Sequence, residues 1–287
     1  MEFKTIISAE DLRDNLDDPD WAIVDCRFYL LEPEKGFQEY LESHIPGAIY
    51  AHLDRDLSGQ VIPGATGRHP LPDSEAFAER LAMWGIDNSL QVIIYDNKGG
   101  ALGARLWWML RWLGHERVAV LDGDWRAWID KGYPVESGEV TRERREFQAV
   151  EHPEYIADVS MVERIREDDN YLLLDARSAQ RYWGLEEPID SIAGHIPGAV
   201  TAPYENNLTA EGYFLNSHEL KERFELLLDG VPPSQMVVYC GSGVTSIHNL
   251  ISMVEAGYEM GLLYPGSWSE WITDPNRPVG PGGKDLE

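Results

Sequence analysis

Residues 236–246 read Met236-Val237-Val238-Tyr239-Cys240-Gly241-Ser242-Gly243-Val244-Thr245-Ser246, an apolar run followed by a loop of small residues and then a helical pattern. The apolar run predicts a buried strand, and the glycines permit a tight turn. The helix after the loop points free N–H groups back at Cys240. Such surroundings lower the pKa of a thiol and favour a reactive thiolate. The alternative is a buried structural cysteine at a strand end.

The strand before Cys240 is part of a pattern that occurs twice in the chain. Four blocks recur in the same order: Ile23–Arg27 with Leu173–Arg177, Ser43–Ala48 with Gly194–Ala199, Val92–Asp96 with Met236–Cys240, and Asp122–Trp128 with Pro265–Trp271. The offset is nearly constant, at 150 positions for Asp25 and Asp175 and 144 for Asp96 and Cys240. The repeat indicates two domains of the same fold.

We place these domains at residues 1–137 and 154–287, joined by a polar, charged linker at 138–153. Short apolar strands alternate with amphipathic helices, which we expect at Ser74–Trp84, Leu102–Leu113 and Ser217–Leu228. That alternation predicts the α/β class, with a mostly parallel sheet flanked by helices in each domain. The tail, Asn276–Glu287, is rich in Pro and Gly, and we expect it to be loosely ordered.

Composition narrows the class of protein. The chain has 287 residues, 43% of them hydrophobic, which suits two packed cores. It has no apolar run of about 18 residues, as a membrane span requires, and its amino end lacks the regions of a signal peptide. Two distant cysteines, Cys26 and Cys240, argue against a disulfide framework. We therefore expect a cytoplasmic protein.

The formal net charge of −26 argues against binding to nucleic acid or to anionic membranes. Small molecules or protein thiols are the expected partners. The histidines form no His-Glu-x-x-His or Cys-x-x-Cys arrangement, so no metal site is expected.

Four features together resemble the rhodanese sulfurtransferase family in its tandem form. They are the paired Asp-x-Arg strands, the two His-Ile-Pro-Gly-Ala turns, the Cys-Gly-Ser-Gly-Val-Thr loop of the second copy, and the Trp-x-x-Trp segment after it. The resemblance implies that the second domain is catalytic and that Cys240 accepts a sulfane sulfur as a persulfide. It implies transfer to cyanide or a thiol, for instance a thioredoxin-like protein, with no metal or organic cofactor.

The loop chemistry agrees with this resemblance. Backbone N–H groups around Gly241, Gly243, Val244 and Thr245 are expected to stabilise a thiolate and a persulfide anion. In the first copy Asp96 stands at the cysteine position. A carboxylate does not carry sulfur in this way, so we expect that domain to be inactive, with Asp96 capping free N–H groups.

The resemblance also implies roles for other residues. It assigns Arg181 to binding the anionic substrate, and it carries His44 and Ser242 over as helpers in proton transfer. His44 and His195 precede identical turns, which points to a fold role for both. Arg27 and Arg177 are expected to pair structurally with Asp25 and Asp175, and the tryptophans of both Trp-x-x-Trp segments and of the run 107–112 are expected to pack. The loop Gly67–Pro70 could face the cleft between the domains, but the sequence alone does not place it.

The sulfur donor stays open between 3-mercaptopyruvate and thiosulfate. Family members specialised for thiosulfate carry cations directly after the cysteine, whereas Gly241 and Ser242 resemble the mercaptopyruvate-specific loop. Those members usually have a second arginine where this chain has Asp190, and a carboxylate there does not attract pyruvate. Despite this carboxylate, the uncharged loop after Cys240 leads us to expect that 3-mercaptopyruvate is the preferred donor.

Two other classes of function, a phosphatase and a non-catalytic module, are alternatives to sulfur transfer. A Cys-based phosphatase needs a loop that ends in Arg, and this loop has Thr245 and Ser246 instead. A non-catalytic sulfur-binding or sensing module predicts a thiol that reacts slowly with alkylating agents.

Overall fold

The computed structural model describes residues 2–280, and its contacts group them into two compact α/β units. The first unit comprises residues 2–59, Leu71–His152 and Thr209–Phe214. The second unit comprises Gln60–Pro70, Pro153–Leu208 and residues 215–280. Each repeat therefore gives a short segment to the unit built mainly from the other repeat. The domain boundaries proposed from the sequence, at 137 and 154, stay a prediction.

The first unit has a parallel sheet with the strand order β1-β5-β4-β2-β3. The strands are β1 (Ile6–Ile7), β2 (Trp21–Asp25), β3 (Ile49–Tyr50), β4 (Gln91–Tyr95) and β5 (Val118–Leu121). The helices are α1 (Ala9–Asp14), α2 (Lys35–Glu42), α3 (Ser74–Met83), α4 (Gly103–Trp112) and α5 (Asp124–Asp130). Strands β2, β4 and β5 are buried along their whole length, as expected for a parallel sheet covered on both faces.

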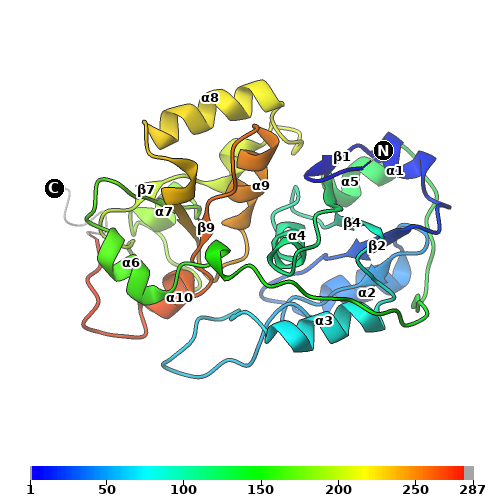
Figure 1. The fold of residues 1–287 in the computed structure, drawn as a ribbon, viewed down its shortest axis with the longest axis horizontal. Helices are drawn as coiled ribbons and strands as arrows, with labels where there is room; N and C mark the ends of the chain where they lie inside the picture. Colours follow the sequence, from blue (N-terminus) through cyan, green and yellow to red (C-terminus); the bar gives the residue numbers. More distant parts are fainter. Residues whose placement is uncertain (1, 281–287) are drawn as a thin grey trace. The chain divides into compact units, whose positions relative to one another are not determined.

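The second unit has a parallel sheet with the order β7-β6-β8-β9. Its strands are β6 (Leu172–Asp175), β7 (Val200–Thr201), β8 (Met236–Tyr239) and β9 (Leu262–Leu263). Its helices are α6 (Val159–Ile165), α7 (Ala179–Tyr182), α8 (Ser217–Leu228), α9 (Ile247–Glu255) and α10 (Ser267–Trp271), with short 3-10 turns at Pro153–Tyr155, Tyr204–Asn207 and Pro233–Gln235. Helix α9 packs against both β8 and α8 (Figure 1). The two central strands, β6 and β8, correspond to β2 and β4 of the first unit.

The predicted helices are confirmed at α3, α4 and α8, and the predicted strand before Cys240 is β8. The tryptophans of α4 are buried, as are Trp128, Trp268 and Trp271. Their packing role is therefore confirmed. Of the carboxyl-terminal tail, residues 281–287 lie outside the described part of the chain.

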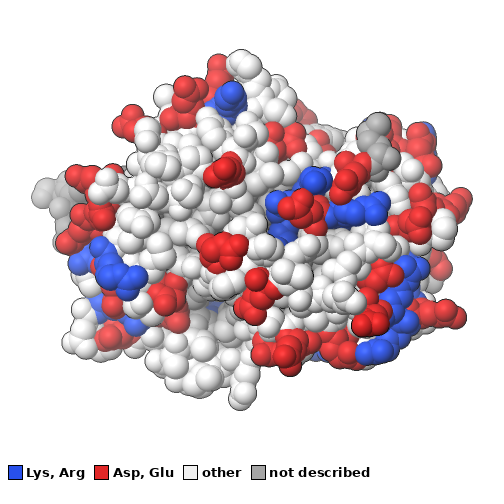
Figure 2. Space-filling model, viewed as in Figure 1, with Lys and Arg blue, Asp and Glu red and all other residues white. Residues whose placement is uncertain are grey.

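The surface carries the excess of acidic side chains. Figure 2 shows Asp and Glu distributed over the face in view, with Lys and Arg gathered in a few groups among them. None of the helices between residues 2 and 280 combines the length and the apolar character that crossing a lipid bilayer requires.

Candidate active site

Cys240 follows the last residue of β8, a central strand of the second sheet. The loop after it runs to α9, which begins at Ile247. Ligands of parallel α/β sheets bind at the carboxyl ends of the strands, which is where this loop lies. The Cys240 side chain is buried, with 2% of its surface exposed, and it forms no disulfide.

The loop forms a cradle of hydrogen-bond donors around the Cys240 sulfur. The backbone N–H of Val244 lies 3.3 Å from Sγ. Burial opposes ionisation of the thiol, but the Thr245 side chain and the backbone N–H groups of Ser242 and Ser246 hydrogen-bond the sulfur and hold its pKa below the ordinary value. The direction of this shift agrees with the depressed thiol pKa expected from the loop composition.

The start of α10 fixes the loop backbone from the other side. The Cys240 N–H donates to Ser267 Oγ at 3.1 Å, and the Trp268 N–H donates to the Cys240 carbonyl at 3.0 Å. The Ser269 N–H donates to the Gly241 carbonyl at 2.9 Å. Ser267 has a φ of +55°, which an L-residue rarely adopts. Strained backbone conformations of this kind occur most often at functional sites, where the surrounding contacts hold them in place.

Gly243 is required in this loop for two reasons. Its φ is +72°, and a Cβ at this position would lie 2.3 Å from the Pro265 carbonyl oxygen. A side chain here would therefore push the loop away from the segment that precedes α10.

His69 meets Ser242 beside the cysteine loop. His69 Nδ1 lies 2.7 Å from Ser242 Oγ, and both side chains are buried. The segment Gln60–Pro70 carries His69 into the second unit. A hydroxyl paired with an imidazole can relay a proton near a reacting sulfur.

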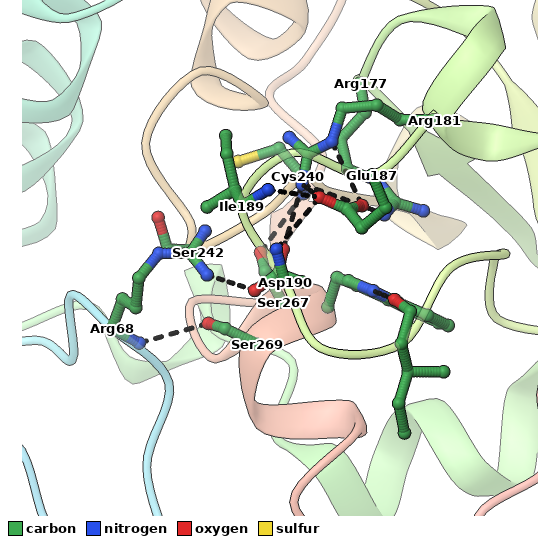
Figure 3. A network of polar contacts seen from close by, with 12 residues as sticks. Arg68, Arg177, Arg181, Glu187, Ile189, Asp190, Cys240, Ser242, Ser267 and Ser269 are labelled. Atoms are coloured by element: carbon green, nitrogen blue, oxygen red, sulfur yellow. Dashed lines mark hydrogen bonds and ion pairs between the residues drawn. The ribbon is translucent and has the colours of Figure 1, made fainter. Parts of the chain in front are cut away.

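Arg181 lies on α7 and is held by two carboxylates. Its Nε and Nη2 form a bidentate pair with Glu187, at 3.1 and 2.8 Å, and Nη2 also donates to Asp190 Oδ2 at 2.9 Å (Figure 3). Burial opposes ionisation of Glu187, yet hydrogen bonds from Arg181 and from the backbone of Asp190 and Ile189 hold its pKa below the usual value.

Arg68 reaches the same group of side chains. Its Nη1 pairs with Asp190 Oδ1, and its backbone N–H donates to Ser269 Oγ at 3.0 Å (Figure 3). A Cβ added at Gly241 would lie 2.9 Å from Arg68 Nη2 and 3.6 Å from Arg181 Nη1. Two guanidinium groups therefore lie against Gly241, next to Cys240.

Arg177 and Arg27 have the structural role expected of them. Arg177 makes a bidentate pair with Asp175, with contacts of 3.0 and 2.7 Å, and Arg27 does the same with Asp25 at 3.1 and 2.7 Å. Each guanidinium also lies over a tryptophan, Trp268 at 4.8 Å in the second unit and its counterpart at 4.5 Å in the first.

His44 lies in the first unit, where it is fully buried. Its Nδ1 lies 2.7 Å from the Tyr40 carbonyl oxygen, and its ring stacks on Tyr40 at 4.3 Å. His195 repeats this arrangement, with Nδ1 3.0 Å from the Tyr182 carbonyl oxygen and ring stacking at 3.9 Å. The fold role expected from the two identical turns is present at both positions. The proton-transfer role of His44 stays a prediction.

Asp96 occupies the corresponding cradle of the first unit. Its carboxylate accepts four backbone N–H groups, from Lys98, Gly100, Leu102 and Gly103, at 2.7 to 2.9 Å. This is the capping role predicted from the sequence. Burial raises the pKa of Asp96, against the effect of these N–H donors. The cradle surrounds the Asp96 carboxyl group in one unit and the Cys240 thiol in the other.

Sequence reasoning missed Arg68 and His69 as site residues, as well as the contacts of Asp190 with two arginines. The signal available was slight: an Arg-His pair in a loop that the sequence left unplaced. In residues 2–280, no three or more His, Cys, Asp or Glu side chains are grouped so that they could hold a metal ion.

Comparison with known proteins gives matches over nearly the whole chain. The rhodanese-like domain model matches twice, at residues 8–131 and 158–274. A protein of Pseudomonas aeruginosa named "Probable 3-mercaptopyruvate sulfurtransferase" is 44% identical over 283 residues, covering 98% of this chain and 100% of the relative. A thiosulfate/3-mercaptopyruvate sulfurtransferase of Arabidopsis thaliana is 33% identical, covering 96% of this chain and 86% of that protein.

The fold also matches solved structures. That of 3-mercaptopyruvate sulfurtransferase from Leishmania major has a TM-score of 0.85 and 30% identity, covering 96% of this chain and 76% of that one. These matches confirm the predicted fold class, in which two rhodanese-like domains follow one another in one chain.

Proposed function

Because the chain belongs to the rhodanese-like family of sulfurtransferases, we propose that Cys240 carries sulfur from a small anionic donor to an acceptor. The observation that carries this proposal is the buried Cys240 thiol, whose pKa is held low by the N–H and hydroxyl groups of its own loop. A lowered pKa increases the share of the thiolate, which is the nucleophile that sulfur transfer requires.

In the first step the Cys240 thiolate attacks the sulfur of 3-mercaptopyruvate. A sulfur–sulfur bond forms and the carbon–sulfur bond breaks, and its electron pair leaves with the carbon as the enolate of pyruvate. The proton of the donor thiol moves to that carbon, which gives pyruvate and a Cys240 persulfide anion. The loop N–H groups, including that of Val244, stabilise the negative charge before and after transfer.

In the second step a nucleophile attacks the outer sulfur of the persulfide. Cyanide gives thiocyanate, and a thiolate gives a new persulfide; in both cases the sulfur–sulfur bond breaks and Cys240 leaves as a thiolate. No external oxidant or reductant is needed. A thioredoxin-like protein is one class of thiol acceptor for this step.

Proton movement in the first step is assigned to Ser242 and His69, which are 2.7 Å apart. Replacement of His69 by Gln should slow mercaptopyruvate turnover by about a hundredfold or more, as loss of a general acid–base does. His44 remains a second candidate, and His44→Gln in the same assay tests it. If only His44→Gln slows turnover, the assignment to His69 is wrong.

The donor carboxylate is expected to bind at Arg68 and Arg181, whose guanidinium groups lie next to Gly241. We place 3-mercaptopyruvate first and thiosulfate second. Ion pairs with Glu187 and Asp190 compensate the charge of the two arginines, and this lessens their attraction for a dianion.

The deciding experiment is steady-state sulfur transfer to cyanide from 3-mercaptopyruvate and from thiosulfate, measured in parallel. We expect a larger kcat/KM with mercaptopyruvate and a loss of at least about a thousandfold in Cys240→Ser. Cys26→Ser is the matched control and should keep its activity. A higher kcat/KM with thiosulfate would reverse the donor order, and no Cys240-dependent turnover would favour the binding or sensing module.

We expect the enzyme to work in the cytoplasm. Both cysteines are free, and a reducing compartment keeps a transfer thiol available. Cell fractionation with an antibody checks this location.

A further inference from the structure

Asp190 lies between the two arginines that face the cysteine loop. Its Oδ1 pairs with Arg68 Nη1, and its Oδ2 accepts a hydrogen bond from Arg181 Nη2 at 2.9 Å. The carboxylate therefore bridges two guanidinium groups that come from different repeats of the chain.

This carboxylate is firmly held. Only 3% of the Asp190 side chain is exposed, and its backbone N–H donates to Glu187 Oε1 at 3.0 Å. Glu187 is itself bound to Arg181. An incoming donor would have to break several buried contacts to displace Asp190, so the bridge is expected to stay in place when a donor binds.

The Asp190 bridge leaves other N–H groups of both arginines available to bind a sulfur donor. Asp190 uses Nη1 of Arg68 and Nη2 of Arg181, whereas Arg68 Nη2 and Arg181 Nη1 are the atoms that come closest to a Cβ added at Gly241. Among the described residues, Arg68 Nε is buried and finds no hydrogen-bond partner. Asp190 thus fixes the two arginines while donor groups still face the loop.

We propose that Asp190 is a fixed counter-ion of the donor site, which positions Arg68 and Arg181 and selects monoanionic sulfur donors over dianionic ones. The inference rests on the sulfur-transfer function proposed above. In their charged forms Arg68, Arg181, Glu187 and Asp190 sum to zero. A monoanion such as mercaptopyruvate therefore adds one negative charge to this group, and a dianion such as thiosulfate adds two.

The test removes the charge of Asp190 and compares the two donors. In Asp190→Asn, kcat/KM for thiosulfate should rise relative to kcat/KM for mercaptopyruvate by about tenfold, as expected for one unit charge at roughly 6 Å in a partly solvated site. Asp190→Ser should shift the ratio in the same direction. Asp169→Asn, at an exposed position of the same unit, is the matched control and should leave the ratio unchanged. An unchanged ratio in both Asp190 variants would overturn the proposal, because a bridge that only supports the fold lowers both values equally.

A second readout does not depend on turnover. The rate constants for alkylation of Cys240 by iodoacetate, an anion, and by iodoacetamide, a neutral reagent of similar size, give a ratio that reports the local charge. Asp190→Asn should raise this ratio several-fold, in line with the added positive charge. A ratio equal to that of the native protein would contradict the counter-ion role even if no donor is turned over, which separates failure of this inference from failure of the proposed function.

Discussion

Two buried cysteines of this protein have opposite electrostatic surroundings. Cys240 is 2% exposed and Cys26 is 3% exposed, so access alone does not separate them. Burial raises the pKa of Cys26 strongly, and the carboxylates of Asp25, Asp96 and Asp56 raise it further. Around Cys240, hydrogen bonds to the sulfur outweigh burial and lower the pKa. The environment, and not the residue type, therefore raises the pKa of one thiol and lowers that of the other.

Alkylation with iodoacetamide measures this difference directly. Because the pKa of Cys240 is lowered, its thiolate forms at a lower pH than that of an ordinary cysteine, and across the pH range below the ordinary thiol pKa its labelling should be the faster of the two. Cys26 should label slowly over the same range, since its pKa is raised. Peptide mapping by mass spectrometry reads both sites in one sample. Equal rates at the two positions would contradict the assignment of Cys240 as the reactive thiol.

At the scale of elements, the loop between β8 and α9 depends on contacts with the segment before α10. Gly243 lies so close to Pro265 that no side chain fits, and its φ of +72° favours glycine. Gly257, at the end of α9, has a φ of +86° but no atom within 4 Å of an added Cβ. A side chain at Gly243 would therefore meet both an unfavourable φ and a steric conflict, whereas a side chain at Gly257 would meet the unfavourable φ alone.

We expect Gly243→Ala to slow alkylation of Cys240 and to abolish most sulfur transfer, because the donors around the sulfur must move. Gly257→Ala should lower the free energy of unfolding by only about 1 kcal/mol, the cost of a positive φ, and should leave Cys240 labelling unchanged. Denaturant unfolding and the labelling rate are the two measurements. Normal labelling in Gly243→Ala would mean that the loop tolerates the displacement.

At the same scale, each repeat contributes one short segment to the unit built mainly from the other repeat. Gln60–Pro70 precedes α3 in the sequence but belongs to the second unit, and Thr209–Phe214 precedes α8 but belongs to the first. Phe214 donates its N–H to Asp122 Oδ1 at 2.8 Å, just before α5, and Arg68 donates its backbone N–H to Ser269 Oγ at 3.0 Å, within α10. Each exchanged segment therefore lies near the matching helix of the unit that it joins, α5 in the first unit and α10 in the second. Only the first segment brings an arginine and a histidine to a cysteine loop.

At the scale of the whole molecule, both repeats keep the same anion cradle, but they fill it differently. In the first unit Asp96 is the anion, bound by four backbone N–H groups. In the second unit Cys240 has a corresponding position. The first repeat therefore stabilises its own loop internally and contributes to the second unit through Gln60–Pro70.

Asp96→Ala leaves those four N–H groups without their acceptor. We expect a loss of about 2 kcal/mol or more in the free energy of unfolding, the cost of buried unsatisfied donors. Asp17→Ala, at an exposed position of the same unit, is the control. The rate of Cys240 labelling under native conditions should be the same in all three proteins, because the contacts of Asp96 lie in the first unit. A stable Asp96→Ala protein would show that the cradle does not need an anion.

The sequence by itself determined the two repeats, the parallel α/β class, the helices α3, α4 and α8, and the place of Cys240 directly after β8. Each of these follows from local apolar periodicity or from residues that recur in both copies, such as the pairs Asp25–Arg27 and Asp175–Arg177.

Only the tertiary structure decided which side chains surround Cys240. His69 meets Ser242 across 173 positions of sequence, and Arg68 meets Asp190 across 122. No periodic pattern connects residues so far apart, because their approach depends on how a loop of one repeat packs on the sheet of the other. For the same reason Asp190, which in sequence is one of three carboxylates within residues 186–190, becomes in the folded chain the bridge between two arginines.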